Sequence, residues 1–194
     1  GSEVKTIGDL AGVPVGISQG SIIDYMTDYL LKAGGLTADQ IQTLAVPKIP
    51  DRMALLLSGE LKAATLPEPF STLAVQQGAV VLADDTAFIG VGSSVVSVRK
   101  SVIDEHPEAV RAFLKAWEQA VNALNTEPEK WRETMGKNKL VPEPLLAGYP
   151  VPQFVTAGVP SQADFDAAAK WALDRGLVQR QALYAECVTD ALIK

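Results

Sequence analysis

The chain has 194 residues, of which 47% are hydrophobic and 21% are charged, and its net charge is −6. These proportions are typical of a globular protein with a buried core and exclude a disordered chain. The acidic balance argues against a nucleic-acid partner, and no apolar run is long enough to cross a membrane. A single histidine and a single cysteine cannot build a zinc site of several such ligands, so no metal and no cofactor are expected.

The first half of the chain alternates strand-like and helix-like segments. Short apolar runs predict four strands, and residues recurring at helical spacing predict a helix after each of the first three. The strands are expected at residues 13–17, 41–46, 61–66 and 79–82, and the helices at 22–33, 50–59 and 67–78. Such βαβ units have right-handed connections, so we expect a parallel sheet with helices covering both faces.

The second half is mainly helical. One further strand is expected at 92–98, and then helices that begin at Pro107, Pro128, Pro142 and Ser161, with a last helix over 183–192. Apolar stripes on these helices include Phe113 with Trp117 and Phe165 with Trp171, and all three tryptophans and Cys187 are expected in the core. Either the stripes cover the first sheet, or they belong to a second sheet whose strands are absent.

The turn after the first strand has two possible functions. Residues 16–20 read GISQG, which matches the G-x-S-x-G nucleophile elbow of esterases. However, this elbow follows the first strand, and the only histidine, His106, lies at a helix start, so a hydrolase is not favoured. The same turn offers backbone N–H groups and the positive end of a helix dipole to a polar or anionic ligand. Simple helix capping by Ser18 or Ser21 is the alternative.

A second polar loop, residues 67–70 (PEPF), follows the third strand. Two prolines hold Glu68 in a stiff loop, although this carboxylate could equally serve the start of its own helix. The carboxyl ends of parallel strands meet at one edge of a sheet, which predicts a shared ligand site. The predicted ligand-binding residues are Ser18, Gln19, Gly20, Ser21, Glu68, Pro69 and Phe70.

The order and spacing of several segments resemble those of substrate-binding proteins of ABC importers. The type is the nitrate/sulfonate/taurine group, which is related to proteins that bind thiamine-pyrimidine precursors. The segments are 6–15 (TIGDLAGVPV), 18–21 (SQGS), 53–64 (MALLLSGELKAA), 67–70 (PEPF), 106–116 and 160–184. The resemblance covers nearly the whole chain.

This resemblance implies an α/β, periplasmic-binding-protein-like (type II) fold of two lobes. Residues 10–90 would form a complete α/β lobe, the second of the family's fold, with a parallel sheet flanked by helices. Residues 91–194 would supply the hinge strand and the mainly helical C-terminal part of the other, incomplete lobe. Gly1 and Ser2 read as a cloning scar, and the opening half of the first lobe is expected to be missing.

The function implied by the resemblance is solute binding without catalysis. A small polar or anionic organic ligand would lie between two lobes, an ABC permease would be the partner, and the location would be periplasmic or extracytoplasmic. A pyrimidine-precursor synthase-like enzyme and the ligand-sensing effector domain of a regulator share the fold and are the alternatives. Uncovered apolar stripes would favour a homodimer with weak or no ligand binding.

Overall fold

The computed structural model describes residues 3–88, 90–92, 94–156 and 158–193. The chain divides into two compact units. The first comprises Gly1–Ser93 and Ala167–Gln181, and the second comprises Ser94–Asp166 and Ala182–Lys194. The segment 167–181 therefore belongs to the first unit, whereas the sequence analysis grouped it with residues 91–194. The assignment of these parts to the two lobes of a larger protein stays a prediction.

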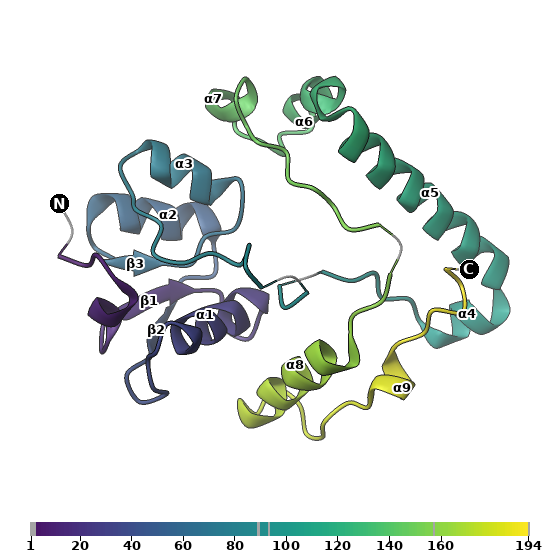
Figure 1. Ribbon diagram of the computed structural model, residues 1–194, viewed down its shortest axis with the longest axis horizontal. Coiled ribbons are helices and arrows are strands. Elements are labelled where there is room, and N and C mark those ends of the chain that lie inside the picture. The colour runs from purple at the N-terminus through teal and green to yellow at the C-terminus, as the bar shows by residue number, and fades with distance from the viewer. Residues whose placement is uncertain (1–2, 89, 93, 157, 194) are drawn as a thin grey trace. The chain divides into compact units, whose positions relative to one another are not determined.

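The first unit is built on a parallel sheet of three strands, β1 (Pro14–Ile17), β2 (Gln42–Ala45) and β3 (Ala63–Ala64). Their order is β2-β1-β3, so β1 is the central strand (Figure 1). The chain moves from β1 to one side and then returns past β1 to the other side. The direction of the connections thus reverses at β1, which makes its carboxyl end the topological switch point.

Helices connect these strands as the sequence predicts. They are η1 (Ile7–Leu10), α1 (Ile22–Ala33), α2 (Ile49–Ser58) and α3 (Phe70–Gln76). Right-handed connections in both directions from β1 place α1 on one face of the sheet and α2 on the other, as Figure 1 shows. The predicted bounds of α1 are confirmed, because Ser21 caps its first turn and Gly34 follows its last residue.

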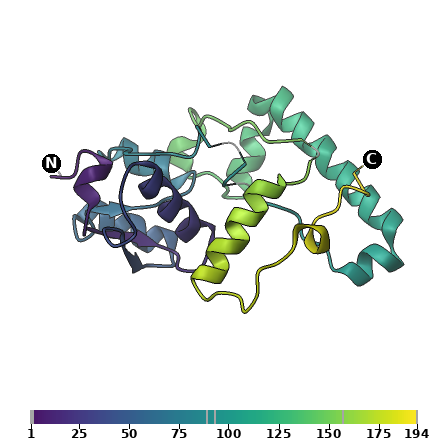
Figure 2. The same ribbon diagram turned by 60° about the horizontal axis from the view of Figure 1, so that its bottom comes forward.

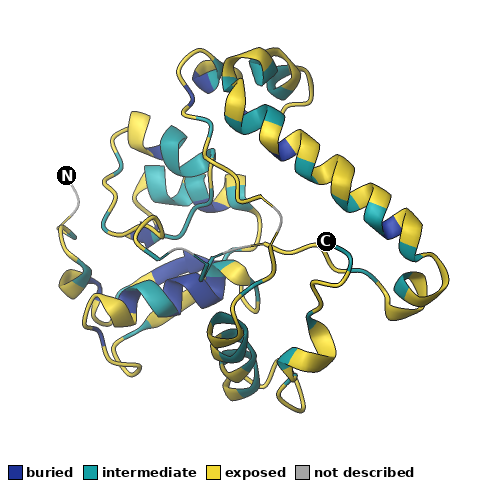
Figure 3. Cartoon of the chain, turned by 45° about the vertical axis from the view of Figure 1, so that its right-hand side comes forward, coloured by how far each residue is buried: buried dark blue, intermediate teal, exposed yellow. Residues whose placement is uncertain are grey.

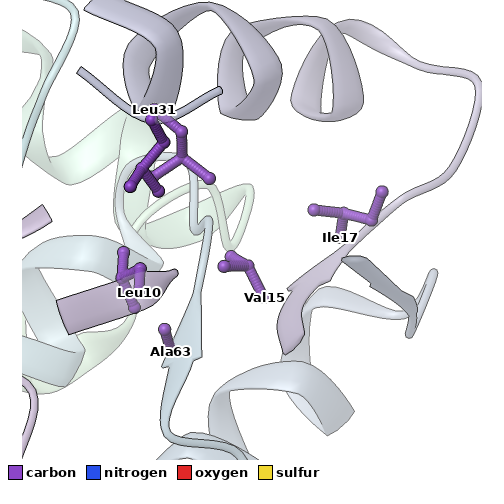
Figure 4. Close-up of a cluster of buried hydrophobic side chains, with 6 residues drawn as sticks. Leu10, Val15, Ile17, Leu31 and Ala63 are labelled. Atoms are coloured by element: carbon purple, nitrogen blue, oxygen red, sulfur yellow. The ribbon is translucent and has the colours of Figure 1, made fainter. Parts of the chain in front are cut away.

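The core of the first unit lies against the sheet. Val15 and Ile17 are buried on β1 and pack with side chains from the segments around them (Figure 4). The cluster comprises Leu10, Val15, Ile17, Leu31, Leu36 and Ala63. By contrast, all four residues of β2 are exposed, so the expectation of a sheet covered on both faces is wrong for this strand.

Two predicted strands are not formed. Residues 79–82 have no strand assignment, nor do 92 and 94–98, and Ser93 lies outside the described residues. Val80 is 76% exposed and Val95 is 62% exposed, so neither segment packs as a strand would. A short β-branched run forms a strand only beside a neighbour that pairs with its backbone groups, and none of the three described strands pairs with these segments.

The second unit has only helices among the elements assigned to its described residues, and extended or irregular segments such as 94–99, 149–156 and 158–161 connect them. Its elements are α4 (Lys100–Glu105), α5 (Pro107–Thr126), η2 (Pro128–Trp131), α6 (Arg132–Lys137), α7 (Glu143–Leu146) and α9 (Tyr184–Cys187), and α8 (Gln162–Asp174) crosses the boundary between the units. The predicted starts at Pro107, Pro128 and Ser161 are confirmed, but the last helix is a single turn. Among the described helices, none combines the length and apolar character that a membrane span requires.

The apolar stripe of α5 is not buried, contrary to expectation. This helix of 20 residues runs unbroken in Figures 1 and 2. Phe113 is 49% exposed and Trp117 is 54% exposed, with ring centroids 6.2 Å apart, and much of α5 is exposed in Figure 3. Cys187 is also exposed, whereas Trp171 packs edge-on against Tyr25 at 5.3 Å. Of the two predicted apolar stripes, the one with Trp171 packs against another aromatic side chain, and the one with Phe113 and Trp117 is largely exposed.

Candidate ligand site at the strand ends

The loops after the three strands lie at one edge of the sheet. The Val46 N–H donates to the Ile17 carbonyl at 2.8 Å, and the Thr65 N–H donates to the Gly16 carbonyl at 3.0 Å. These bonds continue the pairing beyond β2 and β3, so the loops that follow all three strands begin side by side. The central loop, Ser18–Ser21, is called the Ser18 turn below.

The Ser18 turn is held by its own hydrogen bonds. The Ser21 hydroxyl accepts from the Ile23 N–H at 3.2 Å, which makes it the N-cap of α1, and donates to the Ser18 carbonyl at 2.6 Å. The capping interpretation is therefore correct for Ser21. The Gly20 N–H donates to Asp24 Oδ2 at 2.9 Å, while Gln19 and Gly20 are exposed.

The Ser18 side chain faces the neighbouring loop. Its hydroxyl donates to the Pro47 carbonyl at 3.2 Å and accepts from Arg52 Nη1 at 2.9 Å. Neither partner can activate a serine, because a nucleophile needs a general base at its proton. The contacts of Ser18 therefore give no support to the nucleophile elbow.

The Glu68 carboxylate folds back onto α3. It accepts a hydrogen bond from the hydroxyl of Ser71 and another, at 2.8 Å, from that of Thr72. These contacts fit the alternative interpretation, in which Glu68 serves the start of its own helix. Glu68 is exposed, and Pro69 and Phe70 are half-buried at the beginning of α3. The structure thus brings the seven predicted residues to loops at the same sheet edge, and their role in binding stays a prediction.

Arg52, on α2, is the residue of this region that the sequence analysis missed. It is 0% exposed, and Nη1 donates both to Ser18 Oγ and, at 3.2 Å, to the Val46 carbonyl. Nε and Nη2 have no hydrogen-bond partner among the described residues. Burial lowers the pKa of the guanidinium from its usual value, yet arginine remains protonated in proteins.

Gly16 makes room for the Arg52 side chain. A Cβ atom placed on Gly16 would lie 3.2 Å from Arg52 Cγ and 2.8 Å from Leu61 Cδ1. Any larger residue at this point of β1 would therefore push the arginine stem away from the sheet. The glycine is the only signal of the buried arginine in the sequence, and it is too general to have located it.

Two further buried polar side chains on α1 hold the loops at this edge, Asp24 at the Ser18 turn and Thr27 at the loop after β3. Asp24 is 3% exposed, and while its Oδ2 binds Gly20, its Oδ1 has no partner among the described residues. The Thr27 hydroxyl meets that of Thr65 at 2.7 Å. The buried side chains of Arg52 and Asp24 therefore contact the turn at Ser18 and at Gly20. Within the described ranges no three His, Cys, Asp or Glu side chains are grouped as metal ligands.

Comparison with known proteins agrees with the resemblance noted in the sequence. Residues 3–136 match the NMT1-like family. A putative aliphatic sulfonates-binding protein of Escherichia coli strain K12 is 27% identical over 150 residues, which are 76% of this chain and 46% of that protein. The chain therefore spans less than half the length of this relative.

Solved structures show that the fold is shared. The periplasmic aliphatic sulphonate binding protein SsuA from Escherichia coli matches with a TM-score of 0.81 at 22% identity, over 98% of this chain and 67% of the other. The alkanesulfonate-binding protein SsuA from Xanthomonas axonopodis pv. citri, bound to MOPS, matches with a TM-score of 0.71 at 21% identity, over 95% and 65% of the two chains. The expected periplasmic-binding-protein-like fold is confirmed.

Proposed function

Because the chain belongs to the NMT1-like family, we propose that it is the solute-binding component of an ABC-type importer. Its ligand is a small polar or anionic organic molecule, its partner is an ABC permease, and it works in the periplasm or another extracytoplasmic space. Relatives described as sulfonate-binding, one of them as periplasmic, support this assignment. A solute-binding role is preferred to the two alternatives, a pyrimidine-precursor synthase-like enzyme and the ligand-sensing effector domain of a regulator.

One observation carries the proposal. Three polar loops meet at the carboxyl ends of parallel strands, and the central one follows the strand at which the connections reverse. In open α/β sheets this is the position at which ligands bind. The ligand would contact Ser18, Gln19, Gly20 and Ser21 of the Ser18 turn and Glu68, Pro69 and Phe70 of the neighbouring loop.

An NMR titration of the whole chain tests the site. Backbone amide chemical shifts detect even weak binding. This matters because the chain covers at most 67% of each solved relative and its affinity for a ligand is expected to be low. Ethanesulfonate, propionate and the neutral ethyl methyl sulfone serve as probes. We expect saturable shifts of the Gly20 and Phe70 amides with at least one probe, and none at Gln42 at the start of β2. If no probe gives saturable shifts at these loops, the proposed site is wrong.

The absence of turnover is tested separately. Ser18 has a carbonyl and an arginine as hydroxyl partners, so hydrolysis of activated esters should not exceed the background rate. The measurement compares the wild-type chain with Ser18→Ala. Hydrolysis by the wild type that disappears in the variant would contradict a purely binding role.

Self-association of the chain is part of the proposal. Its support is the exposed pair Phe113 and Trp117 on α5, because contiguous aromatic surface of this kind favours association. Light scattering should then report a dimer that Trp117→Glu converts to a monomer. Gln119→Glu adds the same charge at another exposed position of α5 and should leave the dimer intact. A monomeric wild type would overturn this part.

A further inference from the structure

We propose that Arg52 determines the charge preference of the ligand site and makes the Ser18 turn select a ligand with an anionic head group. The inference rests on the proposed function and refines it, since it names the ligand class. Arg52 is a positioning residue in this proposal, because its fully buried side chain acts through Ser18 and does not reach solvent.

The first step is the unbalanced charge of Arg52. A guanidinium has five N–H donors, and among the described residues only Nη1 finds acceptors, Ser18 Oγ and the Val46 carbonyl. Nε and Nη2 are buried, and within the part of the chain that the structure describes they have no hydrogen-bond partner and no carboxylate forms an ion pair with Arg52. An unpaired buried charge is costly unless something compensates it. An anionic group at the Ser18 turn would supply that compensation whenever the ligand is bound.

The second step concerns the other charges around the turn. Asp24 is negative and buried, but it lies in the first turn of α1, where the helix dipole and the Gly20 N–H both stabilise it. Arg52 lies one turn into α2, and its Nη1 reaches the Val46 carbonyl that precedes this helix. The positive end of the α2 dipole therefore adds to the charge of Arg52, and on α2 itself the exposed Asp51 opposes it.

The third step is the path from Arg52 to the ligand. By donating to Ser18 Oγ, Arg52 leaves the Ser18 hydroxyl proton directed at the Pro47 carbonyl. This fixes the start of the Ser18 turn and keeps a positive charge beside Ser18. The exposed residue next to Ser18, Gln19, is then the surface over which an anionic group lies most favourably, since the Gly20 N–H is already bound to Asp24.

The test measures charge selectivity, which a purely structural role would not change. The chain is titrated with ethanesulfonate and with the neutral ethyl methyl sulfone, and the ratio of the two dissociation constants is compared between variants. Arg52→Met keeps an unbranched side chain in place of the arginine stem and removes the charge, a change that buried sites often tolerate. We expect the preference for the sulfonate to fall about tenfold in Arg52→Met and to be largely recovered in Arg52→Lys.

A matched control and a direct signal complete the experiment. Lys48→Met removes an exposed cation at the N-cap of α2, the helix that carries Arg52, and should leave the ratio nearly unchanged, because solvent screens that charge. The Arg52 Nε–H resonance of the wild type should shift with the sulfonate and not with the sulfone, which keeps the test valid if Arg52→Met does not fold.

Two results would overturn the role of Arg52. The first is an unchanged ratio in Arg52→Met, which includes an equal loss of affinity for both probes, and the second is an Arg52 resonance that neither probe moves. Sulfonate and sulfone that bind the wild type equally well would refute the charge preference and leave the proposed function standing. Only a wild type that binds none of the probes would remove the proposed function as well.

Discussion

The Thr27 hydroxyl lies 2.7 Å from the Thr65 hydroxyl and joins the middle of α1 to the loop after β3. Thr27 is 2% exposed and donates its proton to the Ile23 carbonyl at 2.6 Å, so Thr65 is the donor between the two hydroxyls. This contact fixes the distance between α1, which carries the Ser21 cap, and the loop that leads to Glu68.

A double-mutant cycle measures the strength of this contact. Thr27→Val, Thr65→Val and the double variant are unfolded with urea, and the interaction energy is obtained from the difference between their free energies of unfolding. We expect a coupling of about 1 kcal/mol, the usual value for a hydrogen bond between neutral groups. Strictly additive single effects would show that the two hydroxyls do not stabilise each other.

Replacing Gly34 with alanine should destabilise the first unit. A Cβ atom there would lie 2.6 Å from Cγ2 and 3.1 Å from Cβ of Ile7, and a β-branched side chain cannot rotate both atoms away. Overpacking of this kind costs about 1–3 kcal/mol in free energy of unfolding. Gly8→Ala is the control, because its added Cβ would meet only Thr6 Oγ1, at 3.6 Å. Equal effects of the two variants in urea unfolding would contradict the packing argument.

The sequence predicted those elements whose signals are local. The bounds of α1 follow from a capping serine at Ser21 and from Gly34, and both act within one turn of the helix. The segments 79–82 and 92–98 were predicted as strands from their β-branched residues alone. Strand formation also requires a partner, and no pattern within a segment reveals whether the chain supplies one.

The candidate site was predicted in position and only partly in its contacts. Ligands bind at the carboxyl ends of parallel strands, and these ends can be predicted from the order of strands and helices alone. The sequence therefore located the Ser18 turn and the Glu68 loop. It could not show that the hydroxyls of Ser18 and Ser21 bind neighbouring backbone groups. Arg52 was missed for a related reason, since an arginine in an amphipathic helix is ordinarily exposed and its burial depends on the space beside Gly16.

The folded chain should hold the pKa of Asp9 below that of an unstructured aspartate. Its Oδ2 accepts from the Lys5 N–H at 3.0 Å and from the N–H and hydroxyl of Thr6 at 2.8 and 2.9 Å. The Lys5 backbone bond is the largest cause of the lowered pKa. The stabilisation is therefore fully present above the ordinary aspartate pKa and is lost as the pH falls through the lowered value.

An NMR titration of the Asp9 carboxyl carbon checks this. The midpoint should lie below the ordinary aspartate range in the wild type and should move partway back in Thr6→Val, which removes one of the three hydrogen bonds. A midpoint at or above the ordinary range in the wild type would mean that the three hydrogen bonds to Asp9 Oδ2 do not form in solution.

Arg132 should be the main polar anchor of the second unit. Its Nη1 donates to the carbonyls of Leu146 and Tyr149 at 2.9 and 2.8 Å, which ties the start of α6 to the turn after α7. Its other nitrogens bind the Glu129 carboxylate, and these hydrogen bonds lower the pKa of Glu129. The planar guanidinium serves carbonyls on one side and a carboxylate on the other, which the single ammonium of lysine cannot do.

Arg132→Lys should therefore speed hydrogen exchange at the Gly148 amide, which donates to the Leu145 carbonyl at 3.1 Å within the turn that Arg132 holds. Glu129→Gln is the matched control, because it removes the charge of the exposed partner and leaves both carbonyl bonds of Arg132 in place. Exposed ion pairs contribute little to stability, so this variant should exchange at nearly the wild-type rate. If the two variants accelerate exchange equally, the ion pair with Glu129 holds the turn, and the two carbonyl bonds do not.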